Sequence, residues 1–155
     1  MLEVSNKDDD EDCSDGIGGV VFAAEGLGIK HQSISLKIVN NNSSNIILGM
    51  GLPDIIKGHN YKLSEDEHHG LFGISSSGYT VVHNNPEQED ASRAFEFYNG
   101  DVVHIESDAK TRKVVFSKTG TTEKFTLDIP ESFELIKMKF AVALYEKDSV
   151  SIATE

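Results

Sequence analysis

The residues best equipped for chemistry in this chain are the acids of the stretch 98–120, which reads YNGDVVHIESDAKTRKVVFSKTG. Asp101, Glu106 and Asp108 lie close together in the sequence, and His104 lies between them. Carboxylates and a histidine gathered in this way are typical of metal sites and of acid–base catalysis. The alternative is the polar side of two strands joined by a turn, because a half-buried strand requires a polar residue at every second position.

The spacing of these acids does not match that of a glycosidase. Sandwich-fold glycosidases carry acids on one strand at the spacing ExDxxE, so that the nucleophile and the acid face the same cleft. Glu106 and Asp108 fit the first two positions, but Thr111 occupies the third, and the required pair of carboxylic acids is incomplete. The sequence also has no tryptophan to stack on a sugar ring. We therefore interpret the acids as outward polar residues that flank a turn.

Other candidate motifs also fail on spacing. A calcium loop of the EF-hand type needs glycine at its sixth position and glutamate at its twelfth. The acidic run at 8–15 places Cys13 at the sixth position in one register and Phe22 at the twelfth in another. His68 and His69 are adjacent, so their side chains diverge instead of sharing a metal. The stretches GIGGVV and SSSGY lack complete GxGxxG and GxSxG patterns. We expect no metal, no cofactor and no enzymatic activity.

Length and composition indicate one acidic domain. The chain has 155 residues, a usual size for one domain, and no apolar run of about 18 residues that could span a membrane. The net charge is −12, and six acidic residues between 8 and 15 supply half of it. No basic stripe for phosphates is present, so we expect no nucleic-acid partner. A single cysteine and an N-terminus unlike a signal peptide favour a cytoplasmic location.

The order of polar and apolar residues divides the chain into a tail and a domain. Residues 1–15 are densely charged and have little to bury, so we predict a disordered acidic tail, followed by a folded domain over 16–155. In the domain, short runs alternate between apolar and polar residues, as Ile34, Leu36 and Ile38 do, which is the pattern of half-buried strands. We predict strands within 17–24, 31–40, 45–52, 70–84 (two short pieces), 100–108, 113–118, 123–129, 138–145 and 149–153.

This succession of strands predicts an all-β fold, an antiparallel β-sandwich. The segment 138–145 carries apolar or small residues on both faces, so we expect it in the centre of a sheet. The only stretch with helical character is 85–98, which also fits an ordered loop.

Five of these pieces, in this order, resemble the SPRY domain, the core of the B30.2 family. The resemblance covers about residues 17–153, and it departs from the family pattern at Thr119 in place of asparagine, at Phe140 in place of proline, and in the lack of an early tryptophan. Its most specific part is the hairpin formed by GDVVHIESD (100–108) and KVVFSKTG (113–120). The pieces are ILGMG (47–51), SGYTV (77–81), GDVVHIESD (100–108), KVVFSKTG (113–120) and MKFAVALY (138–145).

The resemblance implies a concanavalin-like jelly-roll sandwich that acts as a non-enzymatic protein–protein interaction module. Its loops are expected to bind a partner protein or peptide, and the module is expected to serve as the substrate-recognition or adaptor domain of a larger protein. Loops on a rigid scaffold are the usual place for binding residues. We expect the loops 53–61 and 83–90, with the turn before Tyr79, to form the site. The candidate partner-binding residues are Tyr61, Tyr79, His83, Asn84 and Asn85.

These candidates also have structural explanations. The two tyrosines fit core or corner positions with satisfied hydroxyl groups, and the two asparagines fit a turn before Pro86. We expect a monomeric domain without a membrane partner, whose acidic surface favours a basic protein or peptide. Two other functions stay open at this point: a lectin-like or glycan-processing sandwich, and a structural component of a larger assembly.

Overall fold

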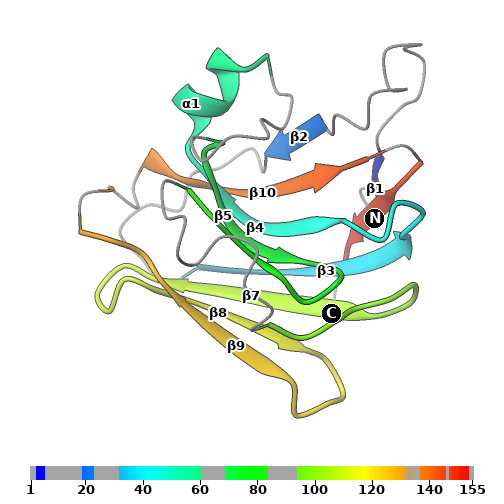
Figure 1. The fold of residues 1–155 in the computed structure, drawn as a ribbon. Coiled ribbons are helices and arrows are strands. Elements are labelled where there is room, and N and C mark those ends of the chain that lie inside the picture. Colours follow the sequence, from blue (N-terminus) through cyan, green and yellow to red (C-terminus); the bar gives the residue numbers. More distant parts are fainter. Residues whose placement is uncertain are drawn as a thin grey trace.

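Two antiparallel sheets pack face to face in the computed structural model of the protein (Figure 1). The structure describes residues 3–5, 19–22, 32–60, 69–83, 94–131, 133, 137–145 and 147–153. The elements in chain order are β1 (Glu3–Ser5), β2 (Gly19–Phe22), β3 (Gln32–Asn40), β4 (Ile47–Gly51), α1 (Pro53–Gly58), β5 (Leu71–Ser75), β6 (Thr80–Val82), β7 (Val102–Asp108), β8 (Lys113–Lys118), β9 (Lys124–Asp128), β10 (Lys139–Leu144) and β11 (Ser149–Ile152).

The strand order confirms the predicted antiparallel sandwich. One sheet has six strands in the order β1-β11-β3-β7-β8-β9, and the other has five in the order β2-β10-β4-β5-β6. Each strand from β2 to β11 lies within a range predicted from the alternation of residues. β10 lies between β2 and β4, which confirms the expectation of a central strand.

The inner faces of the two sheets form the main hydrophobic core. Leu36 and Ile38 of β3 and Val103 and Ile105 of β7 face inward, as their alternation predicts, and they are buried in one cluster with residues such as Phe72 of the other sheet. Each large side chain buried in this way contributes roughly 1.5–3 kcal/mol. Burial between the sheets is therefore the main force that holds the strands, and hence their connecting loops, in place.

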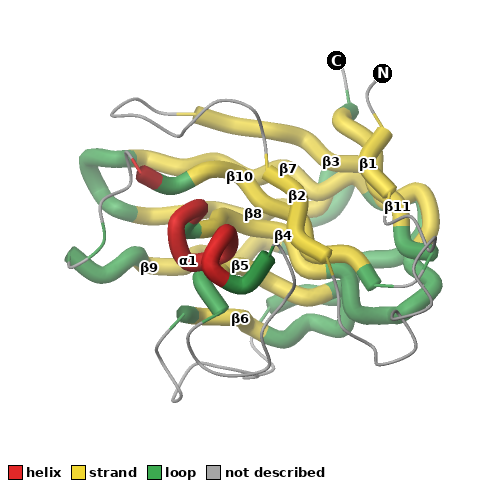
Figure 2. Tube along the Cα trace, turned by 90° about the horizontal axis from the view of Figure 1, so that it is seen from above, coloured by secondary structure: helices red, strands yellow, loops and turns green. Residues whose placement is uncertain are grey.

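The outer face of the five-stranded sheet is also apolar. Ile47, Leu71 and Ala143 form a second buried cluster with Ile56 of α1, which lies over β4 and β5 (Figure 2). The sequence did not predict this helix, since 53–58 was expected to be part of a binding loop. No side chain caps its first turn, so the usual start signal of a helix is missing, although a proline stands at its beginning.

Two further segments bear on the predictions. Residues 94–98 have no helical structure, which agrees with the ordered loop given as the alternative for 85–98. Glu3–Ser5, within the predicted disordered tail, form β1, which pairs with β11. The acidic run that motivated the tail prediction lies outside the described residues. Among the residues that the structure does describe, no helix has the length and apolar character needed to cross a membrane.

Candidate functional site

The acids of the stretch 98–120 do not converge on one point. The backbone N–H of Tyr98 donates to Asp101 Oδ2 at 2.7 Å, and the backbone N–H of Lys110 donates to Asp108 Oδ1 at 2.9 Å. Gly100 has a φ of +90°, which closes the turn before β7 and suits glycine. The acids at both ends of β7 therefore hold turns. Within the described ranges, no three His, Cys, Asp or Glu side chains gather so as to hold a metal ion.

Glu106 belongs to a row of polar side chains on the outer face of the six-stranded sheet. Ser35 Oγ lies 2.7 Å from His104 Nδ1, and His104 Nε2 lies 3.0 Å from Glu106 Oε1. Serine, histidine and a carboxylate follow one another as in a hydrolase triad, but the two ring nitrogens are exchanged, since a catalytic serine contacts Nε2 and the acid contacts Nδ1. Hydrolysis also needs N–H donors aimed at the developing oxyanion, whereas the backbone of β3 and β7 is committed to the pairing of neighbouring strands. We therefore interpret this row as a cross-strand contact.

Five connections meet at one end of the sandwich. Because the strands are antiparallel, the connections after β3, β5, β8 and β10 and the segment before β7 all lie on the same side (right-hand side of Figure 1). Tyr79 and Tyr98 lie at this end, and the two residues are 44% and 57% exposed. We call this surface, formed by residues 41–46, 76–79, 94–101, 119–123, 145 and 147–148, the tyrosine end.

Hydrogen bonds fix the two tyrosine-bearing segments against each other. The backbone N–H of Ala94 donates to Gly78 O at 3.0 Å, and that of Phe97 donates to Ser76 O at 3.1 Å. Ser76 Oγ in turn accepts from the backbone N–H of Ile46 at 3.2 Å. The segment 94–98 thus runs beside the β5–β6 turn, which explains why it is not helical.

A buried carboxylate ties two other connections of the tyrosine end together. Asp148 is fully buried and accepts hydrogen bonds from the backbone N–H groups of Ser43 at 2.8 Å and Tyr145 at 2.9 Å, and also from the Ser43 hydroxyl. Hydrogen bonds to a charged acceptor are among the stronger ones in proteins. The tyrosine end is therefore preorganised over most of its described length.

Tyr98 lies within a cluster of charged side chains. Lys118 Nζ lies 5.6 Å from the centroid of the Tyr98 ring and 3.5 Å from Asp101 Oδ2. The Tyr98 hydroxyl donates to the Glu96 carboxylate. This hydrogen bond, with partial desolvation and the nearby negative charges of Glu96 and Asp101, raises the pKa of Tyr98. The exposed ring is held by a cation near its face and a carboxylate at its hydroxyl.

The structure separates the residues that the sequence singled out. Tyr79 lies at the tyrosine end, whereas His83 lies at the opposite end, where it is 5% exposed and accepts from the backbone N–H of Gly70 at 2.9 Å. Tyr61, Asn84 and Asn85 lie outside the described residues. Tyr98 was missed, although its position directly before an Asn-Gly turn was a signal of an exposed corner.

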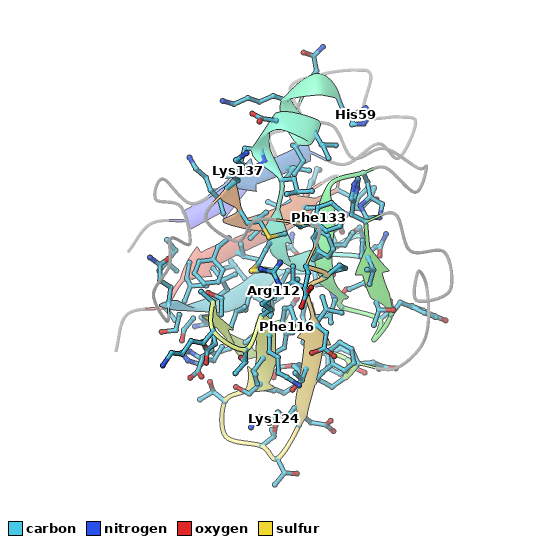
Figure 3. All side chains as sticks on the ribbon, turned by 90° about the vertical axis from the view of Figure 1, so that its left-hand side faces the viewer. His59, Arg112, Phe116, Lys124, Phe133 and Lys137 are labelled. Carbon is cyan, nitrogen blue, oxygen red and sulfur yellow. The ribbon has the colours of Figure 1, made fainter. Side chains whose placement is uncertain are left out.

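The opposite end is built around aromatic and arginine contacts. The ring of His83 lies 5.5 Å from that of Phe133, centroid to centroid. Arg112 has a φ of +57°, and its guanidinium donates to the backbone oxygens of Pro130 at 2.6 Å and of Phe133 (Figure 3). These side chains hold the described connections of the opposite end together.

Comparison with known proteins identifies the fold. No protein-family model and no curated protein sequence matches the chain. The SPRY domain of human HERC1 superposes with a TM-score of 0.67 at 17% identity, over 89% of this chain and 83% of that one. This chain has the SPRY fold. The SPRY-fold likeness extends to the PSpry domain of TRIM65, with a TM-score of 0.61, 11% identity, and coverage of 88% of this chain and 71% of that one. Stonustoxin matches with a TM-score of 0.62 and 10% identity over 86% of this chain, which corresponds to 20% of the stonustoxin chain.

Proposed function

We propose that this SPRY-fold chain is a non-enzymatic interaction module that binds a partner protein or peptide through its tyrosine end. The observation that carries the proposal is the pair of exposed aromatic side chains, Tyr79 and Tyr98, on connections held together by hydrogen bonds. Tyrosine is enriched among the residues that dominate binding energy, since its ring offers a large contact area and its hydroxyl a polar contact.

The rigidity of the surface supports the same proposal. Binding to a preformed surface avoids much of the entropy cost of ordering loops. The Tyr98 ring is already oriented by Glu96 and Lys118 before a partner arrives. A tyrosine fixed in this way loses little further freedom on binding, so more of its contact energy appears as affinity.

The wider setting of the module belongs to the same proposal. We propose that it serves as a recognition or adaptor domain of a larger cytoplasmic protein, and that its partner is basic. The net charge of −12 supports a basic partner. The single cysteine supports a reducing compartment. The fold shared with a domain of HERC1 supports a role as one part of a larger protein.

The proposal is tested by selecting peptides from a displayed random library against the purified chain and measuring their affinities by fluorescence anisotropy. We expect Tyr98→Ala and Tyr79→Ala each to weaken the binding of selected peptides by about 2 kcal/mol, roughly 30-fold. Lys110→Ala, on the exposed turn at the opposite end, is the matched control and should leave the affinity unchanged.

The thermal midpoint of each variant separates binding from folding. Loss of binding with an unchanged midpoint supports the tyrosine end as the site. If the selected peptides bind the Tyr79→Ala/Tyr98→Ala double variant as tightly as the parent chain, the tyrosine end is not the binding surface. A glycan array on the same samples addresses the lectin alternative, and saturable binding of a glycan without any peptide binding contradicts the proposal.

A further inference from the structure

β9 forms one edge of the six-stranded sheet. In the described part of the chain it pairs with β8 alone. The N–H of Lys118 donates to Glu123 O at 3.2 Å, just before β9 begins. The N–H of Ile129 donates to Arg112 O at 2.9 Å, just after β9 ends. In an antiparallel ladder hydrogen-bonded pairs alternate with non-bonded ones. Phe125 and Leu127 therefore direct their backbone N–H and C=O groups to β8. Lys124, Thr126 and Asp128 direct theirs away from β8, at the edge of the sheet.

We call Lys124, Thr126 and Asp128, whose backbone N–H and C=O groups point away from β8, the outward residues. Their side chains are exposed on the outer face of the sheet, while Leu127 is buried and Phe125 packs partly buried against the core. The strand reads KFTLD, with a cation at its start and an anion at its end. Its central residue, Thr126, is uncharged and β-branched, which suits a strand interior.

Two copies of this strand are complementary when they run antiparallel about Thr126. In this register Lys124 of each copy lies opposite Asp128 of the other, and Thr126 lies opposite Thr126. All the outward residues then stand in hydrogen-bonded pairs, and each such pair exchanges two N–H···O bonds. A register displaced by two residues in one direction sets Lys124 opposite Thr126 and places Asp128 opposite a residue outside β9. The same displacement in the other direction sets Asp128 opposite Thr126 and places Lys124 opposite a residue outside β9. Charge and hydrogen bonding therefore select the same alignment.

We propose that β9 pairs with β9 of a second copy of this chain, so that the six-stranded sheets of two copies join into one continuous sheet. A lysine on an edge strand usually discourages pairing with other proteins. Here the same strand carries the opposite charge at the matching position, so the pairing is directed to a second copy. The inference departs from the monomer expected from the sequence.

The dimer has a consequence for the proposed function, although it does not depend on that function. β9 begins at the tyrosine end and finishes at the opposite end. Because the two β9 strands run antiparallel, the two tyrosine ends point in opposite directions. Such a dimer bridges two partner molecules and does not bind one molecule with both sites.

The test is sedimentation velocity of the full chain over roughly 5–500 μM. A strand-edge contact is small, and small interfaces are weak, so we expect a dissociation constant on the order of 100 μM. Lys124→Asp and Asp128→Lys each place like charges opposite each other and should weaken the dimer at least about 10-fold. The double exchange Lys124→Asp/Asp128→Lys restores opposite charges and should recover association to within about 3-fold.

Two controls make the result specific. Asp128 also lies 3.4 Å from Lys113 within the chain, so the Lys124→Asp variant, which keeps that pair, is needed beside Asp128→Lys. Lys110→Asp makes the same charge change on the exposed β7–β8 turn and should not affect association.

Thr126→Pro removes an outward N–H without removing a bond to β8, and should abolish the dimer.

The outcomes divide cleanly. Concentration-dependent association that is lost in both single variants and regained in the double variant supports β9 pairing. A parent chain that sediments as a monomer at every concentration overturns it, and so does a dimer that both single reversals leave intact. If Thr126→Pro does not fold, the charge exchange alone decides. Peptide binding is unaffected by these outcomes, so failure here is distinguishable from failure of the tyrosine end.

Discussion

Among single residues, Tyr98 carries a chemical signature that can be measured directly. Its hydrogen bond to Glu96, with partial desolvation and the charges of Glu96 and Asp101, raises the pKa of Tyr98. The neutral phenol is the form that donates to the carboxylate, so deprotonation breaks this contact. The contact therefore stabilises the folded state below the ordinary pKa of tyrosine, about 10, and is lost as the pH rises through the higher pKa of Tyr98.

We predict that Tyr98 ionises at a higher pH than a free tyrosine, and that Glu96→Ala returns its pKa toward the ordinary value. The measurement is the absorbance change at about 295 nm during an alkaline titration, taken as the difference between the parent chain and Tyr98→Phe. Glu96→Gln keeps a hydrogen-bond acceptor without the charge, so we expect an intermediate pKa. A Tyr98 pKa that is the same in the parent chain and in Glu96→Ala would show that the side chains do not interact in solution.

The contacts of single residues show which roles the sequence could predict and which it could not. The acids at 101 and 108 were expected to be outward residues beside a turn, and their contacts to backbone N–H groups confirm that role. The contact between Ser35 and His104 joins residues of two strands far apart in the sequence. No local pattern predicts it, because it depends on the register of β3 against β7.

At the level of elements, strands were predictable and the helix was not. Alternation of apolar and polar residues follows from burial of one face, so the sequence alone reveals strands such as β3, β7 and β8. α1 is short and lacks a capping side chain, and its place over the second apolar cluster depends on tertiary packing. Residues 94–98 had some helical character, but their backbone N–H groups pair with the β5–β6 turn. Tertiary contacts override local preference there.

The candidate site was predictable only in part for the same reason. The loops were expected to carry partner-binding residues, and one of the candidates, Tyr79, is exposed on the turn between β5 and β6. Which loops share an end of the sandwich depends on strand order, which alternation does not reveal. His83 shows this limit. Only β6 separates it from Tyr79, but that strand runs from one end of the sandwich to the other, so His83 packs at the opposite end against Phe72 and Phe133. Tyr98 joins Tyr79 only through the pairing of 94–98 with the β5–β6 turn.

The pairing of β4 with β5 supplies a test of packing between elements. Gly49 and Gly73 face each other across these strands. A Cβ added at Gly49 would lie 2.1 Å from Phe72 O, and one added at Gly73 would lie 2.2 Å from Leu48 O. Backbone atoms cannot move away without opening the ladder. We therefore predict that Gly49→Ala lowers the free energy of unfolding by at least about 3 kcal/mol, measured by urea denaturation.

Gly58 provides the matched control for this substitution. It ends α1, and a Cβ added there meets nothing within 4 Å. Gly58→Ala should change the free energy of unfolding by less than about 1 kcal/mol and in the stabilising direction, because alanine restricts the unfolded chain. Equal effects of the two substitutions would mean that β4 and β5 do not approach as closely as the structure has them.

Across the whole molecule, net charge is the property that acts at the longest range. The chain carries −12, and half of that charge comes from the acidic run at 8–15. Charges of one sign attract an oppositely charged partner before contact and increase the association rate. Salt screens this attraction over distances beyond roughly 10 Å. For a basic partner, we expect the whole molecule to contribute to its capture, while the direct contacts are those proposed for the tyrosine end.

We predict that the affinity for a selected basic peptide falls roughly 10-fold as sodium chloride rises from about 0.05 M to 0.5 M, mainly through a slower association rate measured by stopped-flow fluorescence. Exchanging the six acids of the run for asparagine and glutamine halves the net charge to −6 and should reduce this salt dependence. Exchanging aspartate for glutamate in the same run preserves the charge and should preserve the dependence. An affinity that stays constant with ionic strength would contradict the proposal of a basic partner. It would not contradict the proposed aromatic contacts of the tyrosine end.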